Sequence, residues 1–274
     1  NVYFSRNDHH KGAKRVFNID FPAIDDSDNY EEKVKENEVF RLIDVLFQER
    51  SKAIAKFISE KIFRFFVYSS PADVDNEIIE QMADTFIKNE FELLPVYKQL
   101  FTSKFFYSEA VVGAQIKTPQ EFIIGIQKMF GKEFKSGNTK KSREACEALE
   151  MELYDPPNVG SWAAYRSWIS TTTYPNRYKY AKEYLSLFSD KEILDYGKKF
   201  SNYQDANQLL NDFIDYFFPK ALSNERKERY KAVMLNEIPE NEWANSYNSS
   251  STKVVAGLRN LFDEIVLSPD FNLC

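Results

Sequence analysis

The sequence predicts a mainly α fold: a multi-helical globular bundle with one small N-terminal β-hairpin. Three observations lead to this prediction. Apolar residues recur at helical spacing along most of the chain, two capping boxes mark helix starts, and only 8 of the 274 residues are glycine. Because all-β folds and phosphate-binding loops both need glycine in tight turns, its scarcity argues against those classes.

The N-terminal segment carries the signal for the hairpin. The run NVYFS at 1–5 is aromatic and β-branched, and the run RVFNIDF at 15–21 alternates apolar with polar side chains. An alternation with a period of two is typical of a half-buried strand. Since Gly12 lies between the runs, we expect them to pair as antiparallel strands around a loop containing this glycine.

Helices are expected along most of the remaining chain, because apolar side chains repeat there on one helical face. The expected ranges are about 39–47, 51–66, 75–88, 93–103, 119–130 and 142–153, and the chain is again largely helical over 177–267. The segment ANSYNSSST at 244–252 is an exception, since its composition predicts a loop.

The strongest helix start is the stretch TPQE. Thr118 can cap the helix, Pro119 suits the first helical position, and Glu121 completes a capping box. Gly131 is placed to end the same helix. A second capping box begins at Ser189, with Glu192 three residues later.

The chain is predicted to form a single helical domain over 1–274, with a possible subdivision in the polar segment 132–141. Its net charge of −6 and the lack of a dominant basic patch argue against nucleic-acid binding. No apolar run reaches the ~18 residues of a transmembrane helix. Cys146 and Cys274 are too few for a disulfide framework or a cysteine-based zinc site, and no cofactor is expected.

Four motifs, taken in order, resemble the bacterial family known as domain of unknown function 1800. They are FISEKIFRFFV (57–67), KTPQEFIIG (117–125), YDPPNVGSWAAYRSWISTTT (154–173) and VLSPDFNLC (266–274). The resemblance implies a helical C-terminal portion of a longer exported protein, located in the periplasm, in the cell envelope or outside the cell. As such a portion, the chain would leave apolar surface uncovered, or covered by a partner.

The N-terminal loop also resembles this family, which shows a His-Asp pair, a glycine and a lysine. His9, Gly12 and Lys14 occupy those places, but His10 stands where the family has aspartate. A second departure follows Trp162, where Ala-Ala-Tyr replaces the family's Pro-Gly-Gly and so removes a tight turn. Both departures affect loops that could otherwise line a pocket.

The pair His9 and His10, next to Asp8, is the first candidate site. Adjacent side chains in an extended segment point to opposite faces, so the two rings are unsuited to binding one metal ion. The sequence leaves open a polar turn stabilised by hydrogen bonds and acid–base chemistry by a single histidine. The first alternative is the simpler one.

Arg64 lies in an aromatic run near the end of an expected helix. An unpaired buried guanidinium is very unfavourable, so it must form an ion pair or reach solvent. The functional alternative is an anion clamp. A pair formed by Lys117 and Glu121 is a weaker candidate, because capping already explains the glutamate.

The remaining candidates follow the Pro-Pro loop: Asn158, Trp162, Arg166, Trp168 and, on the next helix, Arg177. Tryptophan beside Asn and Arg suits stacking against a sugar ring or a peptide. It equally suits a loop that is anchored to the core by its aromatic side chains.

The sequence is therefore compatible with three functions. The leading one is an exported or envelope-associated protein that acts in binding or assembly, without enzymatic activity. Its partner would be the missing N-terminal half, another protein, a second copy of the chain, or a carbohydrate or peptide ligand. The alternatives are a hydrolase built from the His9 loop, Arg64 and the Asn158–Trp168 loop, and a purely structural scaffold.

Overall fold

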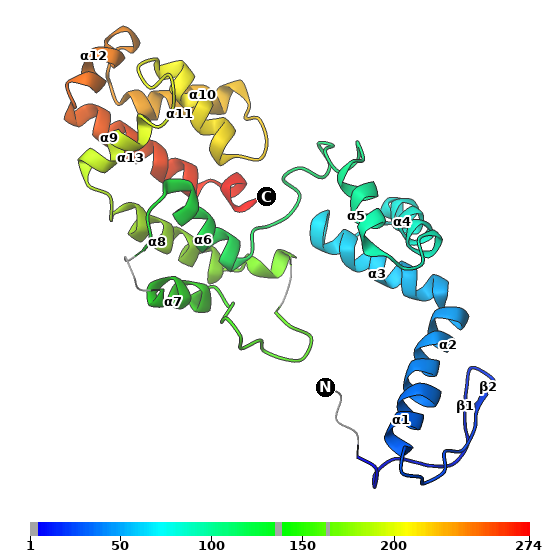
Figure 1. The fold of residues 1–274 in the computed structure, drawn as a ribbon. Coiled ribbons are helices and arrows are strands. Elements are labelled where there is room, and N and C mark those ends of the chain that lie inside the picture. Colours follow the sequence, from blue (N-terminus) through cyan, green and yellow to red (C-terminus); the bar gives the residue numbers. More distant parts are fainter. Residues whose placement is uncertain (1–4, 135–138, 163–164) are drawn as a thin grey trace. The chain divides into compact units, whose positions relative to one another are not determined.

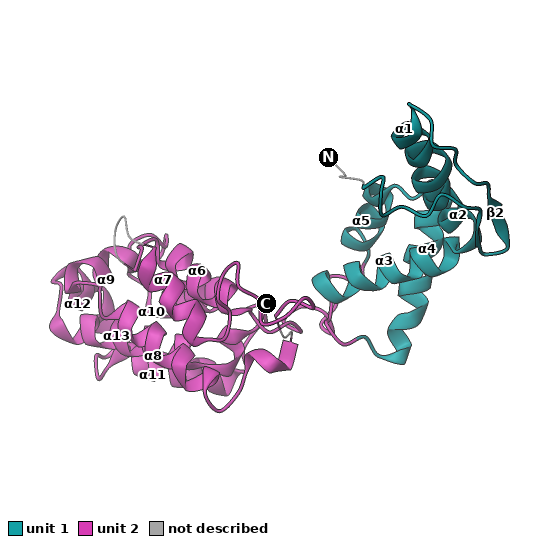
Figure 2. Cartoon of the chain, turned by 90° about the horizontal axis from the view of Figure 1, so that it is seen from below, with its two compact units in different colours: residues 1–66, 71–103 teal, residues 67–70, 104–274 magenta. Residues whose placement is uncertain are grey.

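The computed structural model describes residues 5–134, 139–162 and 165–274, and it confirms the mainly helical fold (Figure 1). The chain forms two compact units (Figure 2). Unit 1 comprises Asn1–Phe66 and Pro71–Ser103, and unit 2 comprises Val67–Ser70 and Lys104–Cys274. The polar segment 132–141, at which the sequence suggested a subdivision, lies within unit 2.

The hairpin forms near the N-terminus, but in a different place from the one predicted. Strand β1 (Lys14–Val16) pairs antiparallel with β2 (Ile19–Phe21), so apart from Lys14 both strands come from the second apolar run. Phe17 and Asn18 have φ of 50° and 64°, the left-handed conformation that a two-residue hairpin turn requires. The turn is therefore at this pair and not at Gly12. Residues 1–4 of the first run lie outside the described residues.

Unit 1 continues with helices. Their bounds are α1 Tyr30–Val34, the π-helical turn η1 Lys35–Phe40, α2 Arg41–Glu49, α3 Ser51–Phe66, the 3-10 turn η2 Asp73–Asp75, α4 Asn76–Lys88 and α5 Leu93–Phe101. Helix α4 packs against α3 and α5. Its buried residues Ile79, Met82 and Phe86 recur at helical spacing, so one face of α4 forms much of the core of this unit.

Unit 2 is larger, and its described part is helical apart from an isolated antiparallel bridge between Ile116 and Leu273. Its elements are α6 Pro119–Phe130, α7 Lys140–Ala148, η3 Tyr165–Trp168, α8 Thr173–Leu185, α9 Asp190–Gly197, α10 Ala206–Phe217, α11 Asn224–Leu235, η4 Glu240–Glu242, α12 Trp243–Asn248, α13 Thr252–Leu267 and η5 Pro269–Asn272. Helix α13 packs against α8, α9, α11 and α12. The ring of Phe262 on α13 lies 5.2 Å from those of Phe130 and Phe213, so this helix lies at the centre of an aromatic core.

Local sequence signals set several helix ends as predicted. Thr118 Oγ1 accepts a hydrogen bond from Glu121 N at 3.2 Å, and the Glu121 carboxylate accepts one from Thr118 N at 2.8 Å. Gly131 ends α6 with φ 73°. The second capping box, at Ser189, is also formed. These interactions depend on neighbours within three residues, which explains why they could be predicted.

The prediction of a loop at 244–252 is wrong, because helix α12 covers most of this segment. Trp243 and Tyr247, one helical turn apart, are 0% and 1% exposed, and Trp243 Nε1 donates to the Tyr203 carbonyl at 3.0 Å. Burial of two large aromatic side chains therefore outweighs the loop-forming preference of the asparagines and serines. Among the described residues, none of the helices has the length and apolar character needed to cross a bilayer.

Candidate functional site

His9 is held in a polar cluster of unit 1 rather than in an open site. Its Nδ1 lies 2.5 Å from the Tyr30 hydroxyl, and its Nε2 lies 2.7 Å from Glu38 Oε2. Lys14 Nζ donates to the other oxygen of Glu38 at 2.5 Å. The cluster thus joins the N-terminal loop and β1 to α1 and η1, and we call these four residues the His9 cluster.

The geometry of the π-helical turn contributes to this cluster. Glu38 lies within η1, and its side chain is 12% exposed, comparable with 13% for His9. π-Helical turns are rare in proteins and frequently accompany functional sites. Here both ring nitrogens of His9 have close contacts, and Tyr30 is completely buried. The arrangement therefore suits a structural latch, in which hydrogen bonds hold a loop on a helix.

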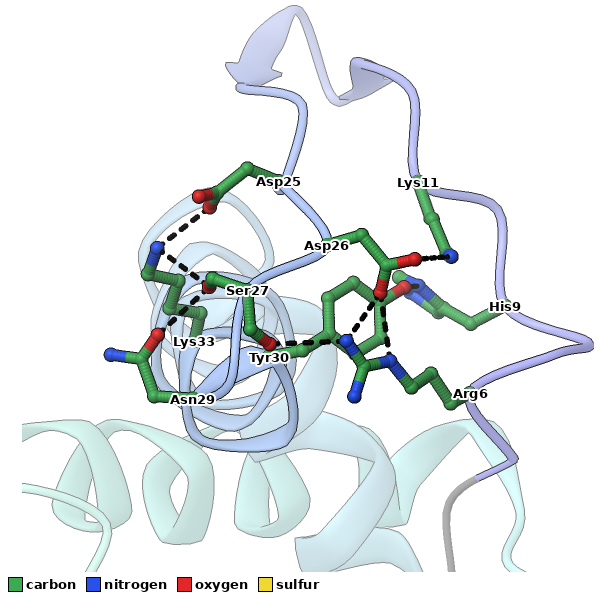
Figure 3. Close-up of polar contacts among 9 residues, drawn as sticks. All are labelled: Arg6, His9, Lys11, Asp25, Asp26, Ser27, Asn29, Tyr30 and Lys33. Atoms are coloured by element: carbon green, nitrogen blue, oxygen red, sulfur yellow. Dashed lines mark hydrogen bonds and ion pairs between the residues drawn. The ribbon is translucent and has the colours of Figure 1, made fainter.

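The N-terminal loop also surrounds the Tyr30 ring (Figure 3). The Arg6 guanidinium and the Lys11 ammonium lie 5.0 Å and 5.4 Å from its centroid, and both cations pair with Asp26. Hydrogen bonds from Lys11 and Arg6 hold the pKa of the Asp26 carboxyl below its usual value. Since Asp26 is exposed, these pairs add little stability each, but together they orient the loop around one buried ring.

Arg64 forms an ion pair within its own helix. It lies on an exposed face of α3, where its Nη2 donates to Glu60 Oε1 at 2.6 Å, one helical turn away. The pair lies within one helix at the surface, and the anion clamp stays a prediction. A surface pair of this kind contributes roughly 0–1 kcal/mol.

Arg177, in unit 2, is 0% exposed and lies among motif residues that are far apart in the sequence. Its guanidinium donates to the Asn272 side chain at 3.2 Å and to the Lys117 carbonyl at 2.7 Å, and it lies 5.0 Å from the Phe122 ring centroid. Burial lowers the pKa of Arg177 to about 10. We call Lys117, Arg177 and Asn272 the buried cationic centre.

Lys117 is the second cation of this centre and is 8% exposed. Its Nζ donates to the Phe271 carbonyl at 2.7 Å and lies 4.3 Å from the centroid of that ring. Burial lowers the pKa of Lys117 to about 8. Backbone carbonyls and aromatic faces thus contact both cations, although the buried Arg177 Nε has no hydrogen-bond partner. These contacts connect the start of α6, α8 and the C-terminal segment.

In the tryptophan-containing loop of unit 2, Trp168 packs into the protein and is not presented to a ligand. Trp168 is buried, and its carbonyl accepts a hydrogen bond from the Thr173 hydroxyl at 3.0 Å. Trp162 is half-buried, whereas Asn158 is exposed and its side chain accepts from Gly160 N at 2.7 Å. Arg166 is exposed and lies 5.4 Å from the Tyr165 ring centroid. Trp168 therefore offers no free face for stacking.

The structure thus divides the sequence-predicted candidates into separate groups. His9 and Lys14 are joined in unit 1, Arg64 forms a surface pair in the same unit, and Arg177 belongs to the buried cationic centre of unit 2. In the described ranges no three His, Cys, Asp or Glu residues form a group that could hold a metal ion. Cys146 is a buried free thiol and Cys274 an exposed one.

Sequence reasoning missed Tyr30, Glu38 and Asn272 as partners of the candidates. Tyr30 and Glu38 lie more than twenty residues from His9, and Asn272 lies 95 residues from Arg177. No short-range pattern connects such residues. The only signal in the sequence was that Lys117 and Asn272 each lie in a segment that resembles the family.

A second kind of site is the exposed apolar face of α2. Five large apolar side chains of η1 and α2 are 36–49% exposed: Val39, Phe40, Leu42, Ile43 and Phe47. We call them the α2 surface. On the same helix Val45 is 4% exposed, so α2 is apolar both toward the core and toward solvent. Helices of soluble monomers usually present polar residues to solvent, and contiguous apolar patches commonly mark interaction sites.

Comparison with known proteins identifies the class of this chain. Residues 1–273 match the family described as "Protein of unknown function (DUF1800)". The chain therefore belongs to this family, as the four sequence motifs predicted. Comparisons with curated proteins and with solved structures gave no match.

Proposed function

We propose that the protein acts in binding and assembly, and that it holds a partner protein on the α2 surface of unit 1. The observation that carries this proposal is the exposure of five large apolar side chains along the successive turns of η1 and α2. Covering this face with a partner would contribute a favourable free energy of roughly 25 cal/mol for each Å² of apolar surface removed from water. An apolar protein segment is the occupant that fits it.

The charge of unit 1 indicates the chemistry of this partner. Residues 1–103 contain 14 Lys and Arg and 19 Asp and Glu, a net charge of −5 out of −6 for the whole chain. Anionic lipid surfaces attract basic segments, so this acidic unit is poorly suited to them. A partner with basic side chains around an apolar stripe would be attracted instead.

The charged residues next to the α2 surface support the same partner. Glu36, Asp44 and Glu49 are exposed and form no ion pair with the described residues. The neighbouring cations are engaged, since Lys35 and Arg50 lie 5.4 Å and 4.9 Å from phenylalanine ring centroids. An amphipathic helix with apolar and lysine faces would therefore meet free carboxylates at the rim.

A synthetic peptide can test this proposal. A fluorescent amphipathic helix built from Leu and Lys should bind the full chain saturably, as measured by fluorescence anisotropy, and added salt should weaken binding. A matched Leu and Glu peptide should bind at least about tenfold more weakly, since it lacks the complementary charge.

Paired variants locate the binding site. Val39→Ser with Ile43→Ser should weaken binding of the Leu/Lys peptide by about tenfold or more, because two central apolar contacts are lost. The control, Val159→Ser with Leu187→Ser, changes two exposed apolar residues of unit 2 and should leave binding unchanged. Equal binding by both peptides, or by both double variants, would contradict the proposal.

Self-association is the competing occupant of the same surface. Sedimentation velocity of the chain over a range of concentrations distinguishes the two. A dimer that Val39→Ser with Ile43→Ser abolishes would show that a second copy covers the α2 surface, and would overturn the proposed basic partner. We also propose an extracytoplasmic location, which the family resemblance supports and fractionation of the producing cells would test.

A further inference from the structure

Unit 2 contains a cavity that neither the buried cationic centre nor the α2 surface uses. It lies along α6 and α7 and has a volume of about 730 Å³, within the range of roughly 300–1,000 Å³ that is usual for small-molecule sites. The cavity is lined from α6, from α7, from residues between these two helices and from the segment that follows α7. We call it the α6–α7 pocket.

The walls of the α6–α7 pocket are mainly apolar. Ile124, on α6, is 39% exposed although it is a large aliphatic residue, and Tyr154, after α7, is 97% exposed. Leu153 and the buried Cys146 add further apolar surface. Burial raises the pKa of the Cys146 thiol to about 11, so this side chain stays neutral at physiological pH. Such walls suit a hydrocarbon chain.

The charged residues at the pocket are predominantly basic. Lys128, Lys132 and Arg143 line it, against a single carboxylate from Glu133. Lys132 is engaged, since its Nζ donates to Glu192 at 2.7 Å. The side chains of Lys128 and Arg143 form no hydrogen bond or ion pair with any described residue. In a chain of net charge −6, this is a local site of positive charge.

From these observations we propose that the α6–α7 pocket binds a single-chain amphipathic anion, an alkyl carboxylate of medium length. Its hydrocarbon chain packs on Ile124, Leu153 and Tyr154, and its carboxylate lies between Lys128 and Arg143. Charge-assisted hydrogen bonds to a carboxylate are stronger than neutral ones, and arginine can bind it with two parallel bonds. This site is independent of the proposed partner binding, because it belongs to the other unit.

Equilibrium dialysis of the full chain with decanoate tests the proposal. We expect saturable binding of one decanoate per chain, at concentrations at which the probe is monomeric. Decan-1-ol and decyltrimethylammonium have the same hydrocarbon chain without the negative charge. We expect their affinity to be lower than that of decanoate by at least about tenfold. Absence of saturable decanoate binding, or equal binding of all three probes, would overturn the proposal.

Variants then place the ligand. Lys128→Gln with Arg143→Gln should weaken decanoate binding about tenfold and leave decan-1-ol binding unchanged. Ile124→Glu should weaken both, because it adds a charge to the apolar wall at an already exposed position. The control, Lys191→Gln with Lys253→Gln, removes two exposed lysines of unit 2 that do not line the pocket. If this control weakens binding as strongly as the pocket variants, the ligand is bound by general electrostatic attraction only.

Discussion

The two units handle apolar surface in opposite ways. Of the 17 large apolar side chains that are exposed in the described part of the chain, 11 belong to unit 1, although this unit is the smaller one. Unit 2 encloses its aromatic rings, and Phe130, Phe213 and Phe262 are at most 2% exposed. The difference shows that unit 2 has a complete core of its own, whereas unit 1 presents part of its apolar residues outward.

Polar groups also follow this division. Unit 2 buries two cations, Lys117 and Arg177, which donate hydrogen bonds to backbone carbonyl groups. Unit 1 uses polar contacts near the surface, in the His9 cluster, to hold its N-terminal loop on the helices. We therefore expect buried substitutions in unit 2 to affect global stability and substitutions in the His9 cluster to act locally.

The largest expected effect is at Phe262. Phe262→Ala removes a fully buried ring from the centre of the aromatic core and should lower the free energy of unfolding by about 3–5 kcal/mol. Urea denaturation measures this change. The matched control is Phe65→Ala in unit 1, where the ring is 74% exposed, and here the change should stay within about 0.5 kcal/mol. Similar losses at both positions would contradict the contrast between the units.

The next effect is a pH dependence from Lys117. Burial lowers the pKa of Lys117 to about 8, whereas the unfolded chain holds this proton up to about 10.5. Between these values the unfolded state binds more protons, so the folded state gains stability as pH rises from 8 to 10.5. Lys117→Met lacks this gain. The stability difference between the wild type and the variant should therefore grow by up to about 3 kcal/mol in the wild type's favour across that window.

Urea denaturation at several pH values measures the Lys117 effect. Cys146 titrates in an overlapping range, because burial raises its pKa to about 11, but it is present in both proteins and cancels in their difference. A difference that stays constant from pH 8 to pH 10.5 would mean that Lys117 is solvated in the folded protein.

The smallest effect concerns the His9 cluster. Glu38→Gln keeps the side-chain size but removes the charge that faces His9 and Lys14, and it should facilitate opening of residues 5–21 by about 1–2 kcal/mol. Hydrogen exchange of these amides reports the change, while unit 2 should be unaffected. The control, Glu60→Gln, breaks the exposed pair with Arg64 and should change exchange very little. Equal effects of the two variants would argue against a latch.

The parts of the fold that could be predicted are those fixed by near neighbours. The capping box at Thr118 and the end of helix α6 at Gly131 were predicted correctly, because each depends on a few adjacent residues. The helix at Trp243 was missed because burial against distant segments, not local preference, decides it. The hairpin turn at Phe17 and Asn18 was missed because an Asn at its second position is a weaker signal than a glycine.

The candidate sites show the same limit. The histidine pair drew attention through its composition, but its role depends on Tyr30 and Glu38, which only the folded chain brings next to it. The motifs correctly identified the family; Lys117 lies in the second motif, and Arg177 follows the third. Their chemistry could not be inferred, because burial, which lowers both pKa values, is a property of the packed structure.

The most direct test of the central claim is the stability of unit 1 after substitution of its α2 surface. Ile43→Ser should change the free energy of unfolding by no more than about 0.5 kcal/mol, because Ile43 is 44% exposed and the two residues have similar helix propensities. Ile62→Ser, at a 7% exposed position of the same unit, should cost at least about 2 kcal/mol. If Ile43→Ser costs as much as Ile62→Ser, the α2 surface is buried within the protein itself and is not available to a partner.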